Sequence, residues 1–112
     1  MVAFGFANAQ TATPVTIAEF LAAEVNDNVY YELTGTISNL TNTTYGNFDL
    51  VDETGTVYVY GLTATKQASN DKSFASLNLV EGDMITIHGT RDAYNGENQV
   101  GGPAYFVSKV EL

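Results

Sequence analysis

Two tyrosines, Tyr58 and Tyr60, occupy alternate positions of the segment Thr-Val-Tyr-Val-Tyr-Gly-Leu at residues 56–62. Successive side chains of a β-strand point to opposite faces, so Val57 and Val59 are predicted to face inward and both tyrosines outward. Nucleic-acid bases and sugars stack on exposed aromatic rings, and each base stack contributes about 1–3 kcal/mol. The spacing is therefore typical of a stacking platform. Because tyrosine is also a favoured strand residue, the alternative is that the pair only packs on cross-strand neighbours and covers the sheet.

The remaining side chains offer little catalytic chemistry. The chain has no cysteine, which excludes disulfides, thiolate catalysis and cysteine-ligated zinc or iron–sulfur sites. The single histidine, His88, is predicted to face outward from its strand, next to Thr86 and Thr90, with no identifiable acid or nucleophile partner. A surface strand residue is the favoured interpretation of His88, and a small hydrolase that uses it is the weaker one. We therefore predict no enzyme, no catalytic residue and no cofactor.

Acidic residues near two predicted turns raise the question of a calcium site. Asp49, Asp52 and Glu53 lack the ligand spacing of a calcium-binding loop, and so does the segment 92–97. Turn formation explains both groups better, so no metal site is predicted.

The charge balance is strongly acidic, with 13 Asp and Glu against 4 Lys and Arg and a formal net charge of −9 over 112 residues. Binding to nucleic acid normally rests on a surplus of basic residues that neutralise phosphates. The basic residues available are Lys66, Lys72, Arg91 and Lys109, so affinity for nucleic acid should be weak unless these four converge. The length fits one domain, and 45% hydrophobic residues exclude a disordered chain.

The elements that must position these residues are one helix and several strands. Residues 16–25 are predicted to form an amphipathic helix, which begins with a capping box of Thr16 and Glu19. Its apolar stripe consists of Ile17, Phe20, Leu21 and Val25. Alternation with a period of two predicts strands at 29–37, 46–52, 56–62, 84–90 and 99–111. Gly35 permits sharp coiling of the first strand, and residues 38–45 form a polar loop.

Turns and one connector join these strands. Glu53-Thr54-Gly55 is predicted to be a tight turn in which Gly55 supplies a positive φ, and Asn95-Gly96 is a strong hairpin signal. Gly101-Gly102-Pro103 interrupts the last strand and predicts a bulge or an edge position, since proline donates no ladder hydrogen bond. Within the connector 63–81, the apolar residues Phe74, Leu77, Leu79 and Val80 are predicted to cap the core.

The order of a helix, three meandering strands, a connector and a closing hairpin is that of an oligonucleotide/oligosaccharide-binding (OB) fold. Four runs carry a closer likeness: LTGTI at 33–37, YGNFDLVDETGTVYVYG at 45–61, LVEGDMITIHGT at 79–90 and YNG at 94–96. On these runs the chain resembles the secreted bacterial OB-fold domains related to the anticodon-binding type. The resemblance covers about residues 29–110. It implies an all-β fold, a five-stranded Greek-key OB-fold barrel. The N-terminal helix is not part of the common barrel of this family, and we expect it to close one open end.

The resemblance also implies where a ligand would bind. In OB-folds the ligand lies across the second and third strands, flanked by the loops between strands one and two and between strands four and five. The candidate ligand-binding residues on this face are Asn47, Asp49, Tyr58 and Tyr60, with Tyr45, Arg91 and Tyr94 at its margins.

The first ten residues are apolar and contain Ala7-Asn8-Ala9, the small-x-small pattern of a signal-peptidase site. We interpret residues 1–10 as the remnant of an export signal or a disordered lead. An apolar N-terminal strand, or a piece of an upstream domain, is the alternative. Residues 11–112 then form a single OB-fold domain, secreted or periplasmic on the exterior of a bacterial cell, without membrane insertion.

Two functions remain open on this basis. The first is a non-enzymatic OB-fold binding module that takes single-stranded nucleic acid on the face of strands two and three. The alternative is a protein- or carbohydrate-interaction module of the cell exterior with no nucleic-acid binding, in which the acidic surface serves solubility.

Overall fold

A computed structural model describes residues 12–66 and 72–111 of the chain. The fold is predominantly β, and the interpretation of residues 1–10 falls outside the described residues. The elements in chain order are β1 (Thr13–Pro14), α1 (Ile17–Ala22), β2 (Asn26–Asn42), β3 (Asn47–Asp52), β4 (Gly55–Tyr60), β5 (Leu62–Thr63), the 3-10 helix η1 (Ser73–Leu77), β6 (Met84–Tyr94) and β7 (Glu97–Lys109).

The long strand β2 belongs to two pairings. Residues Asn26 to Thr36 pair with β6, and Thr36 to Asn42 pair with β3, both antiparallel. Gly35 lies where the strand passes from one partner to the other, and a Cβ atom there would lie 2.7 Å from the main-chain oxygen of Val51. The absence of a side chain at Gly35 therefore allows β2 and β3 to approach closely.

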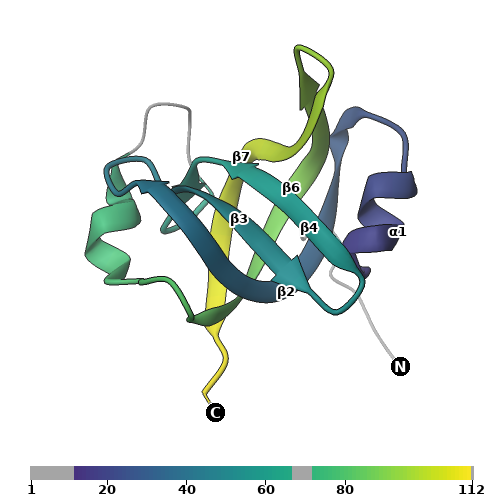
Figure 1. Ribbon diagram of the computed structural model, residues 1–112. Helices are drawn as coiled ribbons and strands as arrows, with labels where there is room; N and C mark the ends of the chain where they lie inside the picture. The colour runs from purple at the N-terminus through teal and green to yellow at the C-terminus, as the bar shows by residue number, and fades with distance from the viewer. Residues whose placement is uncertain (1–11, 67–71, 112) are drawn as a thin grey trace, which may run out of the picture.

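The other pairings complete the sheet. β3 pairs with β4 and β6 pairs with β7, both antiparallel, whereas β4 and the short β5 run parallel to β7. Figure 1 shows α1 and η1 at opposite sides of this sheet, with the β6–β7 hairpin extending beyond the other strands. The hairpin turn has positive φ at Asn95 (54°) and Gly96 (80°), as the Asn-Gly pair predicts.

The core consists of inward-facing side chains from every long strand. Alternation in β3 and β4 buries Phe48, Leu50, Val57 and Val59, as predicted. Further buried side chains are Ile17, Phe20, Leu33, Ile37, Phe74, Leu79, Ile85, Ile87, Val100 and Ala104. The connector thus caps the core through Phe74 and Leu79. Val80 does not, because it is 59% exposed beside the turn that precedes β6.

Helix α1 is shorter than the sequence predicts. The capping box is present, with Thr16 Oγ1 accepting from the Glu19 N–H at 3.1 Å and Glu19 Oε1 accepting from the Thr16 N–H at 2.8 Å. The helix ends at Ala22 because Ala23 adopts an extended conformation (φ −76°, ψ 158°) that directs the chain into β2. The predicted last residue of the apolar stripe, Val25, is consequently 57% exposed.

Two local predictions are wrong for identifiable reasons. Gly55 has no positive φ, because the β3–β4 turn is held by the Asp52 carboxylate, which accepts from the N–H groups of Thr54 and Gly55. The segment 38–45 is not wholly a loop, since β2 continues to Asn42 by pairing with β3. The predicted bulge in the last strand is confirmed: the register between β6 and β7 shifts between the pairs Thr90–Gly101 and His88–Tyr105.

Candidate functional site

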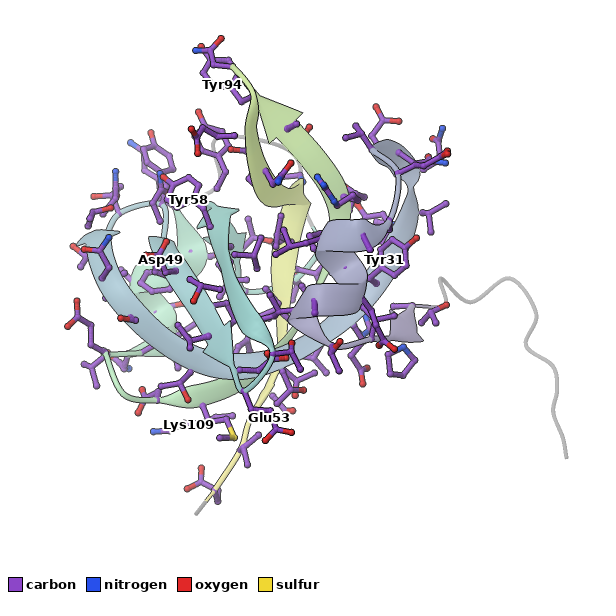
Figure 2. All side chains as sticks on the ribbon, turned by 45° about the vertical axis from the view of Figure 1, so that its right-hand side comes forward. Tyr31, Asp49, Glu53, Tyr58, Tyr94 and Lys109 are labelled. Atoms are coloured by element: carbon purple, nitrogen blue, oxygen red, sulfur yellow. The ribbon has the colours of Figure 1, made fainter. Side chains whose placement is uncertain are left out.

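The outward faces of β3 and β4 bring four predicted site residues together. Asn47 lies opposite Tyr60 and Asp49 opposite Tyr58 in the antiparallel ladder, so all four side chains share one face of the sheet. The Asn47 Nδ2 donates to the Tyr58 hydroxyl at 3.0 Å, and the rings of Tyr58 and Tyr60 have centroids 6.5 Å apart, inclined at 46°. Tyr60 is 60% exposed and Tyr58 is half-buried, with Tyr58 and Asp49 on the same side of the molecule in Figure 2.

A cleft of about 530 Å³ adjoins this face. Tyr45 and Asn47 line it from the β2–β3 side, Tyr60 from the end of β4, Asp92 from β6, and the segment 101–103 from the β7 bulge. The backbone shapes the cleft: at the end of β4 the chain turns through Gly61 (φ 87°), and the Leu62 N–H then donates to the Tyr45 oxygen at 2.8 Å. Tyrosine rings and polar groups therefore meet in one concave site.

The cleft combines neutral polar groups with one carboxylate. Asp92 is the one charged residue among those that line it, and its Oδ2 accepts from Gln99 Nε2 at 2.9 Å. The Oδ1 of Asn47 is buried and has no hydrogen-bond partner within the described part of the chain. Buried polar atoms are normally paired, so this acceptor and Thr90 Oγ1 are the two exceptions among the described residues.

Arg91 was expected at the margin of the face, and the structure corrects that placement. Its side chain is 6% exposed, and its guanidinium donates to the main-chain oxygens of Phe20 and Leu21, at 3.0 Å each. Arg91 thus donates to two of the last carbonyls of α1, and that of Phe20 also accepts from the Ala23 N–H at 3.1 Å. The guanidinium also donates to the main-chain oxygen of Asp92 and to Asn98 Oδ1. All of these hydrogen bonds are within the protein, so the role of Arg91 is structural.

The other basic residues do not converge on the tyrosine face. The Lys66 ammonium lies 4.4 Å from the centroid of the Tyr30 ring, and Lys109 Nζ lies 3.4 Å from Asp83 Oδ1. Lys72 is exposed at the start of η1. The face and cleft therefore have acidic but not basic side chains among their described residues.

Tyr94 occupies a different environment from the other candidates. It is 68% exposed near the tip of the β6–β7 hairpin, which projects from the body of the molecule (Figures 1 and 2). Of the seven candidate residues, the structure thus groups Tyr45, Asn47, Asp49, Tyr58 and Tyr60, leaves Tyr94 at a projecting tip and buries Arg91 against α1.

A second polar group, formed by Glu32, His88 and Tyr105, was not predicted from the sequence. On the outer face of β2, β6 and β7, His88 Nε2 lies 2.9 Å from Glu32 Oε1, and His88 Nδ1 lies 3.1 Å from the Tyr105 hydroxyl. The outward orientation of His88 was predicted, but its partners depend on cross-strand register. Burial, reinforced by the neighbouring Tyr30, raises the pKa of Tyr105 above its usual value. The phenol is therefore harder to ionise, which argues against a nucleophilic role.

Neither metal ligation nor a membrane span is indicated by the described residues. Within 12–66 and 72–111, no group of three or more His, Asp or Glu side chains is arranged to hold a metal ion. In the same ranges, no helix has both the length and the apolar character needed to cross a bilayer.

Comparison with known proteins gives a fold relationship. No family model matches the chain, and no curated protein matches it in sequence. Among solved structures, the hypothetical protein YgiW from E. coli superposes with a TM-score of 0.58 at 16% identity, covering 88% of this chain and 91% of that one. At this identity the likeness shows a shared mostly-β fold alone.

Proposed function

We propose that the chain is a non-enzymatic binding module of the OB-fold type, which holds its ligand across the outward face of β3 and β4 and in the adjoining cleft. The observation that carries the proposal is the outward Tyr58–Tyr60 pair beside a concave site lined by Tyr45 and Asn47. Stackable rings and a few convergent polar groups are typical of small-ligand sites.

The strand pairings support the OB-fold assignment. Each of β2, β3, β4, β7 and β6 pairs with the next, and β6 pairs in turn with β2. Such a cycle is the pattern of a five-stranded barrel, in which β3 and β4 are the second and third strands. The location proposed for the module, the exterior of a bacterial cell, rests on the Ala7-Asn8-Ala9 pattern.

The charge of the site favours a protein or carbohydrate ligand. Asp49 and Asp92 lie on the face and in the cleft, and no described Lys or Arg lines either. A polyanion would gain little from counterion release there. Single-stranded nucleic acid is the second candidate, supported by the Tyr58–Tyr60 pair, because base stacking does not itself require a cation.

Titration of the ¹⁵N-labelled protein tests the proposal. The probes are a neutral oligosaccharide, a short peptide and a single-stranded oligonucleotide at low salt. We expect amide shifts at Tyr60 and Gly61 with at least one probe, and Tyr60→Ala to weaken that binding about tenfold or more. Val25→Ala removes a similarly exposed apolar side chain elsewhere and should leave affinity unchanged. Shifts confined to residues outside the face and cleft, or equal losses in both variants, would overturn the proposal.

A further inference from the structure

The lining of the cleft is negative because Asp92 is the one charged residue among those that line it. The Asp92 carboxylate uses Oδ2 to accept from Gln99, whereas Oδ1 has no partner within the described part of the chain. The guanidinium of Arg91 donates to the main-chain oxygens of Phe20, Leu21 and Asp92, and not to the Asp92 carboxylate. A concave site with charge of one sign concentrates its field and attracts the opposite charge.

The walls of the cleft reinforce this preference. Tyr45 and Tyr60 both line it, and the faces of aromatic rings carry negative potential that attracts ammonium and guanidinium groups. Of the Asp92 carboxylate oxygens, Oδ1 accepts no hydrogen bond from the described part of the chain. A positively charged donor would therefore complement the one charged group of the cleft, and neutral sugars and phosphates carry no such charge.

We infer that the cleft binds a lysine or arginine side chain of a basic peptide segment, with its cation on Asp92 and its aliphatic stem along Tyr60. This inference rests on the proposed function and names the ligand of the same site. The volume of about 530 Å³ accommodates one such side chain with part of its flanking backbone. Side chains of this type combine an apolar stem with a charged end, which matches an aromatic wall that ends in a carboxylate.

The test compares two capped peptides of equal length, one containing Lys and Arg and the other with Gln at the same positions. A neutral oligosaccharide and the polyamine spermine are the further probes, and binding is followed by ¹⁵N chemical shifts and calorimetry. We expect the basic peptide to shift the amides of Gly61, Asp92 and Gly101, and to bind about tenfold or more tightly than its Gln counterpart.

Two variants separate a local contact from general attraction. Asp92→Asn keeps an acceptor for Gln99 and should weaken the basic peptide about tenfold. Asp27→Asn removes the same charge from an exposed position of β2 and should change affinity less than twofold. Equal effects of the two variants would overturn the inference, since the attraction would then come from net charge alone. Thermal melts verify that both variants remain folded.

The remaining outcomes distinguish this inference from the proposed function. Cleft binding of the oligosaccharide or the Gln peptide, equal to that of the basic peptide, would overturn the inference and leave the binding module intact. Tighter binding of spermine than of the basic peptide would also overturn it, because the source of the cation would be a free polyamine. No shift in the face or cleft with any probe would overturn both proposals.

Discussion

Asp52 joins the β3–β4 turn to the first turn of α1 through both of its carboxylate oxygens. Oδ2 accepts from the Ile17 N–H at 3.0 Å, and Oδ1 accepts from the Thr54 N–H and hydroxyl at 2.7 and 2.6 Å. Burial alone would raise the pKa of Asp52. The hydrogen bonds from the Thr54 side chain and from the N–H groups of Ile17, Thr54 and Gly55 outweigh that effect, so the pKa is lowered.

Asp52→Asn is expected to lower the free energy of unfolding by about 1–2 kcal/mol. The amide has one oxygen in place of two, so its NH2 group would face either the Ile17 N–H or the donors of the turn. A carboxylate with a lowered pKa stabilises the fold fully above the unfolded value of about 3.9, and this stabilisation is lost as the pH falls through the folded value. The melting temperatures of wild type and variant should therefore converge in acid. Asp27→Asn, at an exposed position, is the control, and a difference that grew on acidification would contradict the assignment.

The hydrogen bonds of His88 determine where its ring proton lies. An ionised carboxylate only accepts, so in the neutral imidazole the ring proton is on Nε2, which donates to Glu32. The Tyr105 hydroxyl then donates to Nδ1.

Long-range ¹H–¹⁵N spectra of the neutral imidazole should accordingly show Nε2 protonated and Nδ1 unprotonated. Glu32→Gln is expected to weaken this preference, because a side-chain amide can also donate to Nε2. Tyr105→Phe should preserve it, since the Glu32 bond remains. A native spectrum with the proton on Nδ1 would contradict the hydrogen-bond arrangement.

At the scale of elements, the close packing of β2 against β3 depends on Gly35, which has no side chain. A Cβ atom on Gly35 would meet the Val51 oxygen at 2.7 Å and Leu50 Cγ at 3.0 Å, so β2 and β3 would have to separate. Gly35→Ala should lower the free energy of unfolding by about 1–3 kcal/mol, measured by urea denaturation. A Cβ atom on Gly55 would make only an ordinary 3.6 Å contact with Ile17 Cγ2, which makes Gly55→Ala the matched control. Equal losses of stability in the two variants would contradict the close approach.

Elements whose form is decided by their own residues were predictable from the sequence. The capping box of Thr16 and Glu19, the alternation of β3 and β4 and the Asn95-Gly96 turn all depend on short-range spacing. The alternation of β3 and β4 alone predicts that Asn47 and Asp49 face outward from one strand, and Tyr58 and Tyr60 from the other.

Features that depend on distant segments were not predictable in this way. Arg91 caps a helix far away in sequence, and the partners of His88 follow from the register of three strands. The cleft likewise forms where the β7 bulge lies beside the end of β4. The alternation of side chains along a single strand does not predict which strands lie side by side. Sequence therefore indicated the stacking face but not the acidic cleft beside it.

At the scale of the whole molecule, the net charge of −9 is largely uncompensated by local pairs. Within the described ranges, one Lys–carboxylate pair is present, between Lys109 and Asp83, and one His–carboxylate pair, between His88 and Glu32. Exposed carboxylates therefore repel one another over distances comparable with the Debye length of about 10 Å at 0.1 M salt. Such self-repulsion destabilises the folded state relative to the expanded chain.

Added salt should consequently stabilise the protein. Between about 20 mM and 500 mM NaCl at neutral pH, we expect the melting temperature to rise by a few degrees, measured by calorimetry. The double variant Glu24→Gln, Asp27→Asn removes two neighbouring exposed charges and should show a smaller rise. The same screening should weaken a basic peptide in the cleft, so stability and affinity should change in opposite directions with salt. A melting temperature that fell with salt would instead indicate that favourable ion pairs dominate the electrostatics of the fold.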